Sequence, residues 1–374
     1  MSALRGAERD ALYCFARTHV RPGALGRDEA AAFDRALWGR LAATGVFRAA
    51  VAGDVAAAAR AFAGLAHGGL DVPLGLSAVA QWIGVHLLAR FGEGRRAQDI
   101  ERLIDGRWIV AVCNAEPHAG TELRGLRSRV EPDGAGGHLA TIHKSSASNL
   151  SAADLAIVSL WEPRGAGEPV LAVIAVPAGA PLVQTSHVER LAGFRTGLTG
   201  ALDSPTPLAI RLDEVRLGED GARVLRRCFD LERVLIGALL QGCVDGLLDE
   251  CSEHLRAREA EDPQVVRHQY VQDKLATIFT LARRVEGIVG LAAGSELAAS
   301  GDLLSAAKLT AVEDSLLAAT TAYELLGYAG YQRASFVQKA VRDLLAFKLL
   351  GGTRELMKIT MFRELKARWV REPG

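Results

Sequence analysis

The sequence predicts a mostly helical α+β protein with an N-terminal helical domain, a central β-barrel-like domain and a C-terminal four-helix bundle. Three observations lead to this prediction. Apolar residues recur three and four apart up to about residue 105 and again from about residue 221, which is the period of an amphipathic helix. Between these regions the apolar runs are short and are separated by Gly, Pro and Asp, as in strands joined by turns. A chain of 374 residues is long enough for two or three domains.

The N-terminal region, residues 1–105, is expected to be a bundle of helices. Its clearest helical segments are DALYCFARTHV, AAFDRALWGRLAATGVF, DVAAAARAFAGLAH and SAVAQWIGVHLLARFG. Ala and Leu dominate these segments, and both are strong helix formers.

The central region, residues 106–220, is expected to be a compact β domain. Its strand-like runs include WIVAVC, DLAIVSLW, PVLAVIAVP and PLAIRLDEVRL. The Gly-rich text at 133–137 lacks the Lys and the following helix of a phosphate-binding loop, so it predicts the turn of a β-hairpin.

The C-terminal region, residues 221–374, returns to long helical patterns. The first is expected to run from about Asp230 to Arg258, with an apolar stripe at helical spacing. The later ones include YVQDKLATIFTLARRVEGIVGLAA, LLSAAKLTAVEDSLLAATTAYELLG and FVQKAVRDLLAFKLL. Helices of this length and polarity favour an antiparallel four-helix bundle.

Composition excludes several classes of function. Lys+Arg and Asp+Glu both number 44, so no net charge recruits nucleic acid or an anionic membrane. The five cysteines are scattered, and Cys243 and Cys251 lack the spacing of a metal site, so we expect reduced thiols and no metal. No signal-peptide pattern and no run of about 18 apolar residues is present. We therefore expect a soluble cytoplasmic protein without a membrane span.

Several segments, in this order, resemble one known family. They are AEPHAGTE (115–122), HKSSASN (143–149), LAIRLDEVRL (208–217), LERVLIGALLQG (231–242), RAREA (256–260), HQYVQDKLA (268–276), LLGYAGY (325–331) and AVRDLLAFKLLGGTREL (340–356). Their order and spacing resemble the acyl-CoA dehydrogenase family over nearly the whole chain. The resemblance implies that fold, FAD as cofactor, and an acyl thioester of CoA or of an acyl carrier protein as substrate. It also implies a homo-oligomer or a heteromer with a related chain.

The family's chemistry points to one candidate base. Its members remove a proton from the carbon α to a thioester carbonyl while hydride leaves the β carbon, so they need a carboxylate base. Many members carry that base in an E-G-T sequence, which reads Gly351, Gly352 and Thr353 here. Members resembling the long-chain and isovaleryl enzymes use the Glu of L-x-x-E-R instead, which matches Glu232. A Glu near the beginning of a helix is also stabilised by the macrodipole, so a structural role for Glu232 stays open.

The same resemblance implies a set of cofactor contacts. Ser148 matches the hydroxyl that approaches flavin N5, and Thr121 matches the hydroxyl near the diphosphate. Arg258 and Gln269 match residues that meet a cofactor held by a neighbouring subunit. The complete set of candidate cofactor-binding residues is Thr121, Ser148, Arg258, Gln269, Gly327, Gly352 and Thr353.

Five substitutions count against a complete FAD site. Ala115 and Ser146 replace a Thr and an aromatic residue, which removes a hydrogen bond and contact area with the flavin ring. Glu261 and Glu324 bring negative charge to the place expected for the diphosphate, and Tyr328 adds bulk there. In a homodimer this half of the cofactor site is expected to be damaged.

Three functions are therefore compatible with the sequence. The first is flavin-dependent α,β-dehydrogenation of an acyl thioester. The second is a cofactor-poor or non-catalytic partner subunit of a heteromeric acyl-CoA dehydrogenase. The third is a flavin-dependent oxidase or monooxygenase on the same fold. His118, in the first of the resembling segments, is expected to be a surface side chain.

Overall fold

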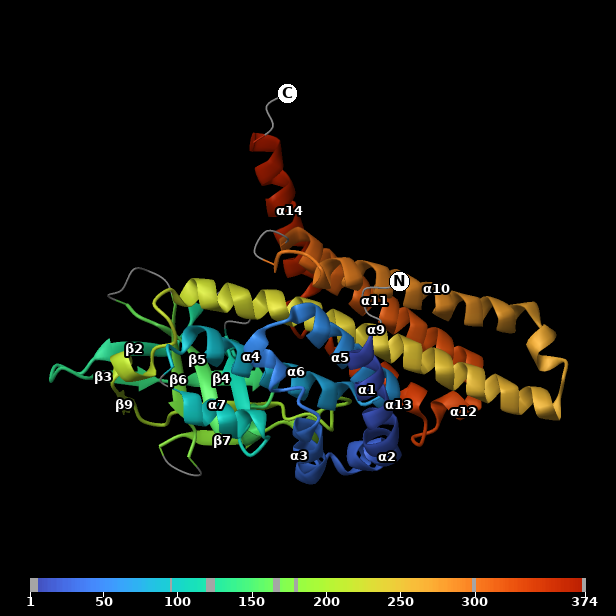
Figure 1. Cartoon of the computed structure of the whole chain (residues 1–374), viewed down its shortest axis with the longest axis horizontal. Helices are drawn as coiled ribbons and strands as arrows, with labels where there is room; N and C mark the ends of the chain where they lie inside the picture. Colours follow the sequence, from blue (N-terminus) through green and yellow to red (C-terminus); the bar gives the residue numbers. More distant parts are fainter. Residues whose placement is uncertain are drawn as a thin grey trace.

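The computed structural model describes residues 6–94, 96–118, 125–163, 169–177, 181–297 and 301–371. It confirms the predicted fold class, with helices in both terminal regions and sheets between them (Figure 1). In Figure 1 the sheets lie at one end of the elongated molecule, and the long C-terminal helices extend to the other end. The N-terminal helices lie against the middle of these long helices.

The N-terminal region consists of helices joined by short connections. They are α1 (Ala7–Phe15), α2 (Arg21–Ala30), α3 (Arg35–Ala43), α4 (Ala49–Ala52), α5 (Val55–Gly69), α6 (Val72–Phe91) and α7 (Ala97–Ile104), with a π-helical turn at Ala16–Val20. Asp34 and Asp54 begin α3 and α5, because each carboxylate accepts a hydrogen bond of 2.9 Å from the backbone N–H three residues later.

Helix α6 is the one helix in the described part of the chain whose length and hydropathy would suit a membrane span. However, 89% of its apolar window is buried inside the protein, and the helix packs against α9, α7 and β1. Its apolar character is therefore that of a central core helix.

The central region contains two sheets. Its strands are β1 (Val110–Cys113), β2 (Arg129–Pro132), β3 (His138–Thr141), β4 (His143–Ala147), β5 (Leu155–Trp161), β6 (Pro169–Ala175), β7 (Val183–Ser186), β8 (Gly200–Asp203) and β9 (Leu208–Ile210). One sheet has the order β1-β5-β2-β3-β9 with β6 paired to β5, and the other has the order β4-β8-β7. The hairpin predicted at 133–137 is confirmed, since β2 and β3 pair in antiparallel register on either side of it.

The C-terminal region begins with the longest helix. Its helices are α8 (Leu212–Val215), α9 (Gly221–Glu261), α10 (Gln269–Ala293), α11 (Gly301–Leu326), α12 (Tyr328–Tyr331), α13 (Phe336–Ala346) and α14 (Arg354–Arg371). The prediction that the first helix begins near Asp230 was wrong, because the Asp220 carboxylate caps it by accepting a hydrogen bond from the Arg223 N–H. Glu232 consequently lies in the helix interior, where the macrodipole of the first turn does not act.

The two helical regions share one hydrophobic core, whereas the sheets enclose a second. Gly242 of α9 packs so closely on α5 that a Cβ at this position would lie 2.0 Å from the carbonyl oxygen of Ala63. The other end of α9 packs on the sheets, where Gly221 approaches the carbonyl of Pro169. The predicted boundaries near residues 105 and 220 fall between α7 and β1 and directly before α9, and the division into three domains stays a prediction.

Candidate active site

A buried ion pair joins two of the resembling segments in the central region. Lys144 Nζ lies 2.7 Å from Glu116 Oε1, and neither side chain is more than 1% exposed. The carboxylate also accepts hydrogen bonds from the backbone N–H groups of residues 127–128. In addition, the backbone N–H of Ser145 donates to the carbonyl of Ala115 at 3.0 Å. These contacts hold the segment at 115–118 against β4.

The charges of this pair are stabilised by each other. Burial alone would raise the pKa of Glu116, but the hydrogen bonds from Lys144 and its other donors bring that pKa below its ordinary value. Burial lowers the pKa of Lys144, while Glu116 opposes that effect. Removing one partner of such a pair strands a buried charge. The pair was not predicted from the sequence, because a contact across 28 residues leaves no local pattern.

Ser148 is half-buried directly after β4, where the strand is irregular. The register with β8 shifts within residues 144–147, and Ser146 is exposed with a left-handed backbone (φ 54°). Asn149 is also left-handed (φ 68°), and its Nδ2 donates to backbone carbonyls of α6 and β1 at 2.9 and 3.0 Å. The buried Asn149 side chain therefore fixes the turn that presents Ser148.

Glu232 of α9 faces the turn that contains Gly351. Gly351 has a left-handed backbone (φ 63°), and a Cβ built on it would lie 3.7 Å from the Glu232 carboxyl carbon. The same Cβ would lie 2.6 Å from Cδ1 of Ile236, so a side chain at 351 would need a strained backbone and a displaced Ile236. The two alternative positions for the family's base thus face the same space, and only Glu232 supplies a carboxylate there.

Lys308 of α11 donates hydrogen bonds to the backbone of this turn and lies close enough to interact electrostatically with Glu232. Its side chain is 1% exposed, and its Nζ donates to the carbonyls of Phe347, at 3.2 Å, and Gly352. Burial lowers the pKa of Lys308 to about 8, although its attraction to Glu232 opposes this shift. Burial also raises the pKa of Glu232, against the opposing charges of Lys308 and Arg233. A carboxylate of raised pKa is better matched to a weakly acidic proton.

Helix α13, which leads into the Gly351 turn, is anchored by buried charges. Lys339 Nζ lies 2.6 Å from Asp343 and 3.4 Å from Asp71 at the beginning of α6, and all three side chains are at most 1% exposed. Asp343 also accepts a hydrogen bond of 2.6 Å from the backbone N–H of Phe194. This network joins α13 to α6 and to the loop before β8, so it fixes the position of the turn beside Glu232.

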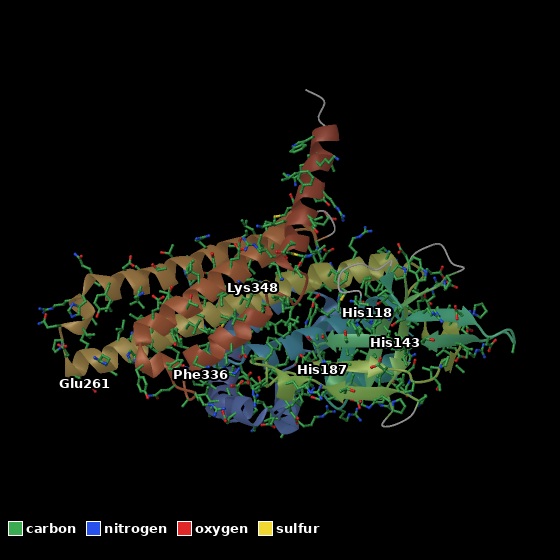
Figure 2. All side chains as sticks on the ribbon, turned by 180° about the vertical axis from the view of Figure 1, so that it is seen from behind. His118, His143, His187, Glu261, Phe336 and Lys348 are labelled. Carbon is green, nitrogen blue, oxygen red and sulfur yellow. The ribbon has the colours of Figure 1, made fainter. Side chains whose placement is uncertain are left out.

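Three predicted cofactor residues lie at the opposite end of the helical bundle. They are Arg258, Gln269 and Gly327. Arg258 follows Glu232 by 26 residues within the uninterrupted helix α9, which is about 39 Å along its axis. Figure 2 shows Glu261 at the far tip of the long helices, whereas His118 and His143 lie among the strands. One chain does not bring both groups of residues to a single cofactor.

The substitutions at that far end are exposed. Glu261 lies beside Asp262 at the end of α9, and both are exposed. Glu324 forms an ion pair with Lys274, and this positive charge offsets part of the repulsion that Glu324 was expected to exert on a diphosphate group. Tyr328 is 80% exposed, so it fills no space inside this chain.

The remaining predicted residues have structural contacts or fall outside the described part of the chain. Thr121 lies outside the described residues. Gly352 accepts a hydrogen bond from Lys308, and Thr353 Oγ1 accepts one of 3.3 Å from Leu356 N–H in the first turn of α14. Their contacts with a cofactor stay predictions. His118 is exposed, as expected.

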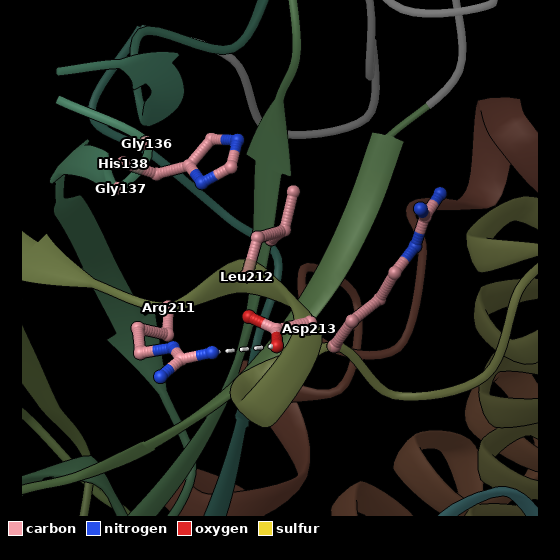
Figure 3. Close-up of a pocket in the computed structure, with 7 residues that line it drawn as sticks. Gly136, Gly137, His138, Arg211, Leu212 and Asp213 are labelled. Atoms are coloured by element: carbon pink, nitrogen blue, oxygen red, sulfur yellow. Dashed lines mark hydrogen bonds and ion pairs between the residues drawn. The ribbon is translucent and has the colours of Figure 1, made fainter. Parts of the chain in front are cut away.

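A surface pocket of about 620 Å³ lies at the edge of the sheets, away from these residues (Figure 3). Its lining consists of Gly136, Gly137, His138, Arg211, Leu212, Asp213 and Arg216. Arg211 and Asp213 form an ion pair of 3.2 Å across it. The pocket shares no residue with the predicted site. Among the residues that the structure describes, no group of three His, Cys, Asp or Glu side chains is arranged to hold a metal ion.

Buried polar atoms without partners lie beside the predicted site residues. Within the described residues, Asn114 Oδ1, Asn149 Oδ1 and Arg233 Nε are buried and make no hydrogen bond. They are direct neighbours in sequence of Ala115, Ser148 and Glu232. Five further buried atoms without a partner lie elsewhere in the described residues, so these three atoms alone do not mark a ligand site. The Glu232 side provides the carboxylate and the Ser148 hydroxyl group that the resemblance implies, whereas the Arg258 end provides a single predicted cation beside two carboxylates.

The chain is similar in sequence and in fold to several known proteins. Residues 219–366 match the family described as "Acyl-CoA dehydrogenase, C-terminal domain". The cyclohexane-1-carbonyl-CoA dehydrogenase of Geobacter metallireducens is 25% identical over 276 residues, which cover 71% of this chain and 70% of that protein. The L-prolyl-[peptidyl-carrier protein] dehydrogenase of Pseudomonas fluorescens is 25% identical over 290 residues, with 75% and 74% covered. The structure of butyryl-CoA dehydrogenase from Megasphaera elsdenii superimposes with a TM-score of 0.87 at 20% identity, covering 96% of this chain and 97% of that one.

Proposed function

The chain belongs to the acyl-CoA dehydrogenase family, and we propose that it oxidises an acyl thioester between the α and β carbons. Glu232 is the base in this proposal. The observation that carries the proposal is the Glu232 carboxyl group beside Gly351, with 3.7 Å between its carbon and the Cβ that a side chain at 351 would have. A carboxylate is thereby retained where the family's other base position is lost.

The chemistry assigns distinct tasks to the residues of this chain. The Glu232 carboxylate takes the α proton, and the two electrons of the β C–H bond leave as hydride, so a C=C bond forms next to the thioester carbonyl. When bound, FAD supplies the two-electron acceptor for that hydride. In this proposal Ser148 contacts the flavin ring, and Lys308 supports the Gly351 turn beside the base through its hydrogen bonds to the carbonyls of Phe347 and Gly352.

The substrate is proposed to be a thioester of CoA or of a carrier protein. The names of two relatives described above refer to a CoA thioester, and the name of the third refers to a prolyl group held by a peptidyl carrier protein. The raised pKa of Glu232 means that its basic form, and hence activity, is expected to decline as the pH falls through that raised value.

The cofactor site is proposed to be shared between two chains. The 39 Å that separates Glu232 from Arg258 along α9 requires a second chain to bring an Arg258-type residue to the Glu232 half. Helix α14 leaves the body of the protein (Figure 1) and carries an exposed apolar stripe, which is a typical mark of an interface. The stripe consists of Ile359, Phe362, Leu365 and Trp369, which are 44–66% exposed.

A partner-subunit role is the second candidate, and the carboxylates at the far end favour it. Arg258 stands close in sequence to Glu261 and Asp262, which weakens its attraction for a diphosphate. In that case a related chain would supply the diphosphate end, and this chain would contribute the Glu232 half. The FAD content of the chain purified alone and after co-expression with a related chain separates the two candidates.

The proposed reaction is tested by product analysis. The chain is incubated with FAD, an artificial electron acceptor and a panel of acyl-CoA and acyl-carrier thioesters, and the loss of two hydrogens is measured by mass spectrometry. We expect an unsaturated thioester with the wild type and at least 100-fold less with Glu232→Gln, since general base catalysis contributes about 10²–10⁴-fold. Equal activity of the two proteins would assign the base to another residue.

A further inference from the structure

Three lysine side chains of the described residues are buried, and they differ in what balances their charge. Lys144 lies 2.7 Å from Glu116, and Lys339 lies 2.6 Å from Asp343. Lys308 is 1% exposed, yet within the described part of the chain it forms no ion pair. A buried charge without a partner is costly. A side chain that keeps such a charge is therefore a candidate for a functional role.

Lys308 fixes the turn between α13 and α14 at two points. An ammonium group has three donors, and Nζ of Lys308 donates one hydrogen bond to the carbonyl of Phe347, at 3.2 Å, and another to that of Gly352. Between these two acceptors lies Gly351, whose backbone is left-handed (φ 63°). The carbonyl dipoles stabilise the ammonium group, but they carry no charge to balance it.

The same turn faces the Glu232 side chain. A Cβ on Gly351 would lie 3.7 Å from both Cγ and the carboxyl carbon of Glu232. Among the residues that the structure describes, the Glu232 carboxylate makes no hydrogen bond and no ion pair. Lys308 and Glu232 are thus an unpaired cation and an unpaired anion beside one turn.

Other charged groups near Glu232 are occupied or neutral. Arg233 follows it on α9, but the Arg233 guanidinium group is paired with Asp230 at 3.1 Å. Cys228 lies about one turn earlier on the same helix, and burial raises the pKa of its thiol well above the ordinary value. Lys308 of α11 is therefore the cation that has no competing carboxylate.

Electrostatic attraction joins the two unpaired groups. Burial raises the pKa of Glu232, and Lys308 opposes this shift more strongly than Arg233 does. Conversely, burial lowers the pKa of Lys308 to about 8, and Glu232 opposes that shift. Each group therefore stabilises the charged form of the other.

We propose that Lys308 is a positioning residue for the candidate base: it holds the Gly351 turn beside Glu232 and supplies the positive charge that keeps the Glu232 carboxylate ionised. Only the ionised carboxylate can take a proton from the substrate. The catalytic meaning of this inference rests on the proposed function. The coupling between the two charges, in contrast, is a property of the chain without cofactor or substrate.

A titration of Lys308 tests the coupling without turnover. The full chain without FAD is labelled with carbon-13 at lysine Cε, and the Lys308 signal is identified in nuclear magnetic resonance spectra by its titration at about pH 8. We expect Glu232→Gln to lower the midpoint of this titration by at least about half a pH unit, because the carboxylate that favours the ammonium form is gone. The signals of Lys144 and Lys339 are the internal control, since their carboxylate partners are unchanged.

A second titration follows Glu232. The infrared difference between each protein and its Glu232→Gln form reports the ionisation of this carboxyl group. Lys308→Met is expected to raise the midpoint by at least about half a pH unit, and Lys308→Arg, which keeps the charge, to raise it less. Phe347→Leu changes the packing of the same turn but no charge, and it is expected to leave the midpoint unchanged.

The proposal is overturned if Lys308 titrates at the same pH in the wild type and in Glu232→Gln, or if Phe347→Leu shifts the Glu232 midpoint as far as Lys308→Met does. The first criterion needs no variant of Lys308, so it applies even if Lys308→Met does not fold. Reciprocal shifts in a chain that forms no unsaturated product would sustain the coupling and reject the proposed reaction. An unsaturated product without a shift in either titration would overturn this inference and leave the proposed reaction intact.

Discussion

Replacing Lys308 by Met is expected to change how the stability of the protein depends on pH. Lys308 is 1% exposed, and burial lowers its pKa from 10.5 to about 8. Between these two pH values the unfolded chain keeps a proton that the folded chain has released. Stability must therefore rise with pH across this window, because the unfolded state binds more protons.

The size of the effect follows from the pKa difference. Each pKa unit of difference between the folded and unfolded states corresponds to about 1.4 kcal/mol, so burying the Lys308 ammonium group costs on the order of 3 kcal/mol of stability at neutral pH. About 2.5 kcal/mol of this cost disappears between about pH 7 and pH 10. Met has a similar length and no charge, so Lys308→Met removes the pH-dependent part. It also leaves the carbonyls of Phe347 and Gly352 without this donor, which costs about 1–3 kcal/mol each at any pH.

Urea unfolding at several pH values measures the free energy of unfolding and so tests this prediction. The free energy of unfolding of the wild type, minus that of Lys308→Met, is expected to increase by about 2.5 kcal/mol from about pH 7 to pH 10. Lys348→Met is the matched control, since it removes an exposed lysine from the segment that leads into the same turn, and it is expected not to reproduce the increase. If the difference for Lys308→Met stays constant with pH, burial does not lower the pKa of Lys308.

Three further predictions concern the buried charges and the exposed helix. Lys144→Met leaves the buried Glu116 carboxylate without its partner and is expected to lower the free energy of unfolding by about 3–5 kcal/mol in urea unfolding. Adding Glu116→Gln to this variant is expected to recover part of the loss. An unchanged urea midpoint for Lys144→Met would argue against a buried ion pair. Lys339→Met leaves the buried Asp343 carboxylate without its ion-pair partner, while Asp71 keeps its ion pair with Arg27. We expect urea unfolding to show a loss of about 3–5 kcal/mol. Replacing Phe362 and Trp369 by Ser is expected to weaken self-association at least 10-fold in sedimentation experiments; identical sedimentation of variant and wild type would exclude this face of α14 as the interface.

Local patterns in the sequence predicted most of the fold. Helical spacing located the N-terminal helices, and alternating short runs located the strands, because both periods reflect which side chains face the core. The beginning of α9 was predicted too late, since Arg226 and Arg227 interrupt the apolar stripe although Asp220 already caps the helix.

The candidate site was predicted only in part. The motif segments led to the candidates Glu232 and Ser148, because sequence resemblance carries residue types in order, and their roles stay predictions. The buried contacts of Lys144, Lys308 and Asn149 were missed, since each joins segments that are far apart in the chain. Distances between segments are properties of the folded chain, and no local periodicity encodes them.

Anaerobic reduction of bound flavin is the most direct test of the central claim that Glu232 makes this chain a thioester dehydrogenase. The chain, alone or with the related chain that completes its cofactor site, is loaded with FAD, and its absorbance at about 450 nm is followed while thioesters are added. We expect rapid bleaching with the wild type. With Glu232→Gln we expect an unchanged FAD content and no bleaching. Bleaching of Glu232→Gln at the wild-type rate, or a wild type that binds FAD and thioester without any bleaching, would contradict it.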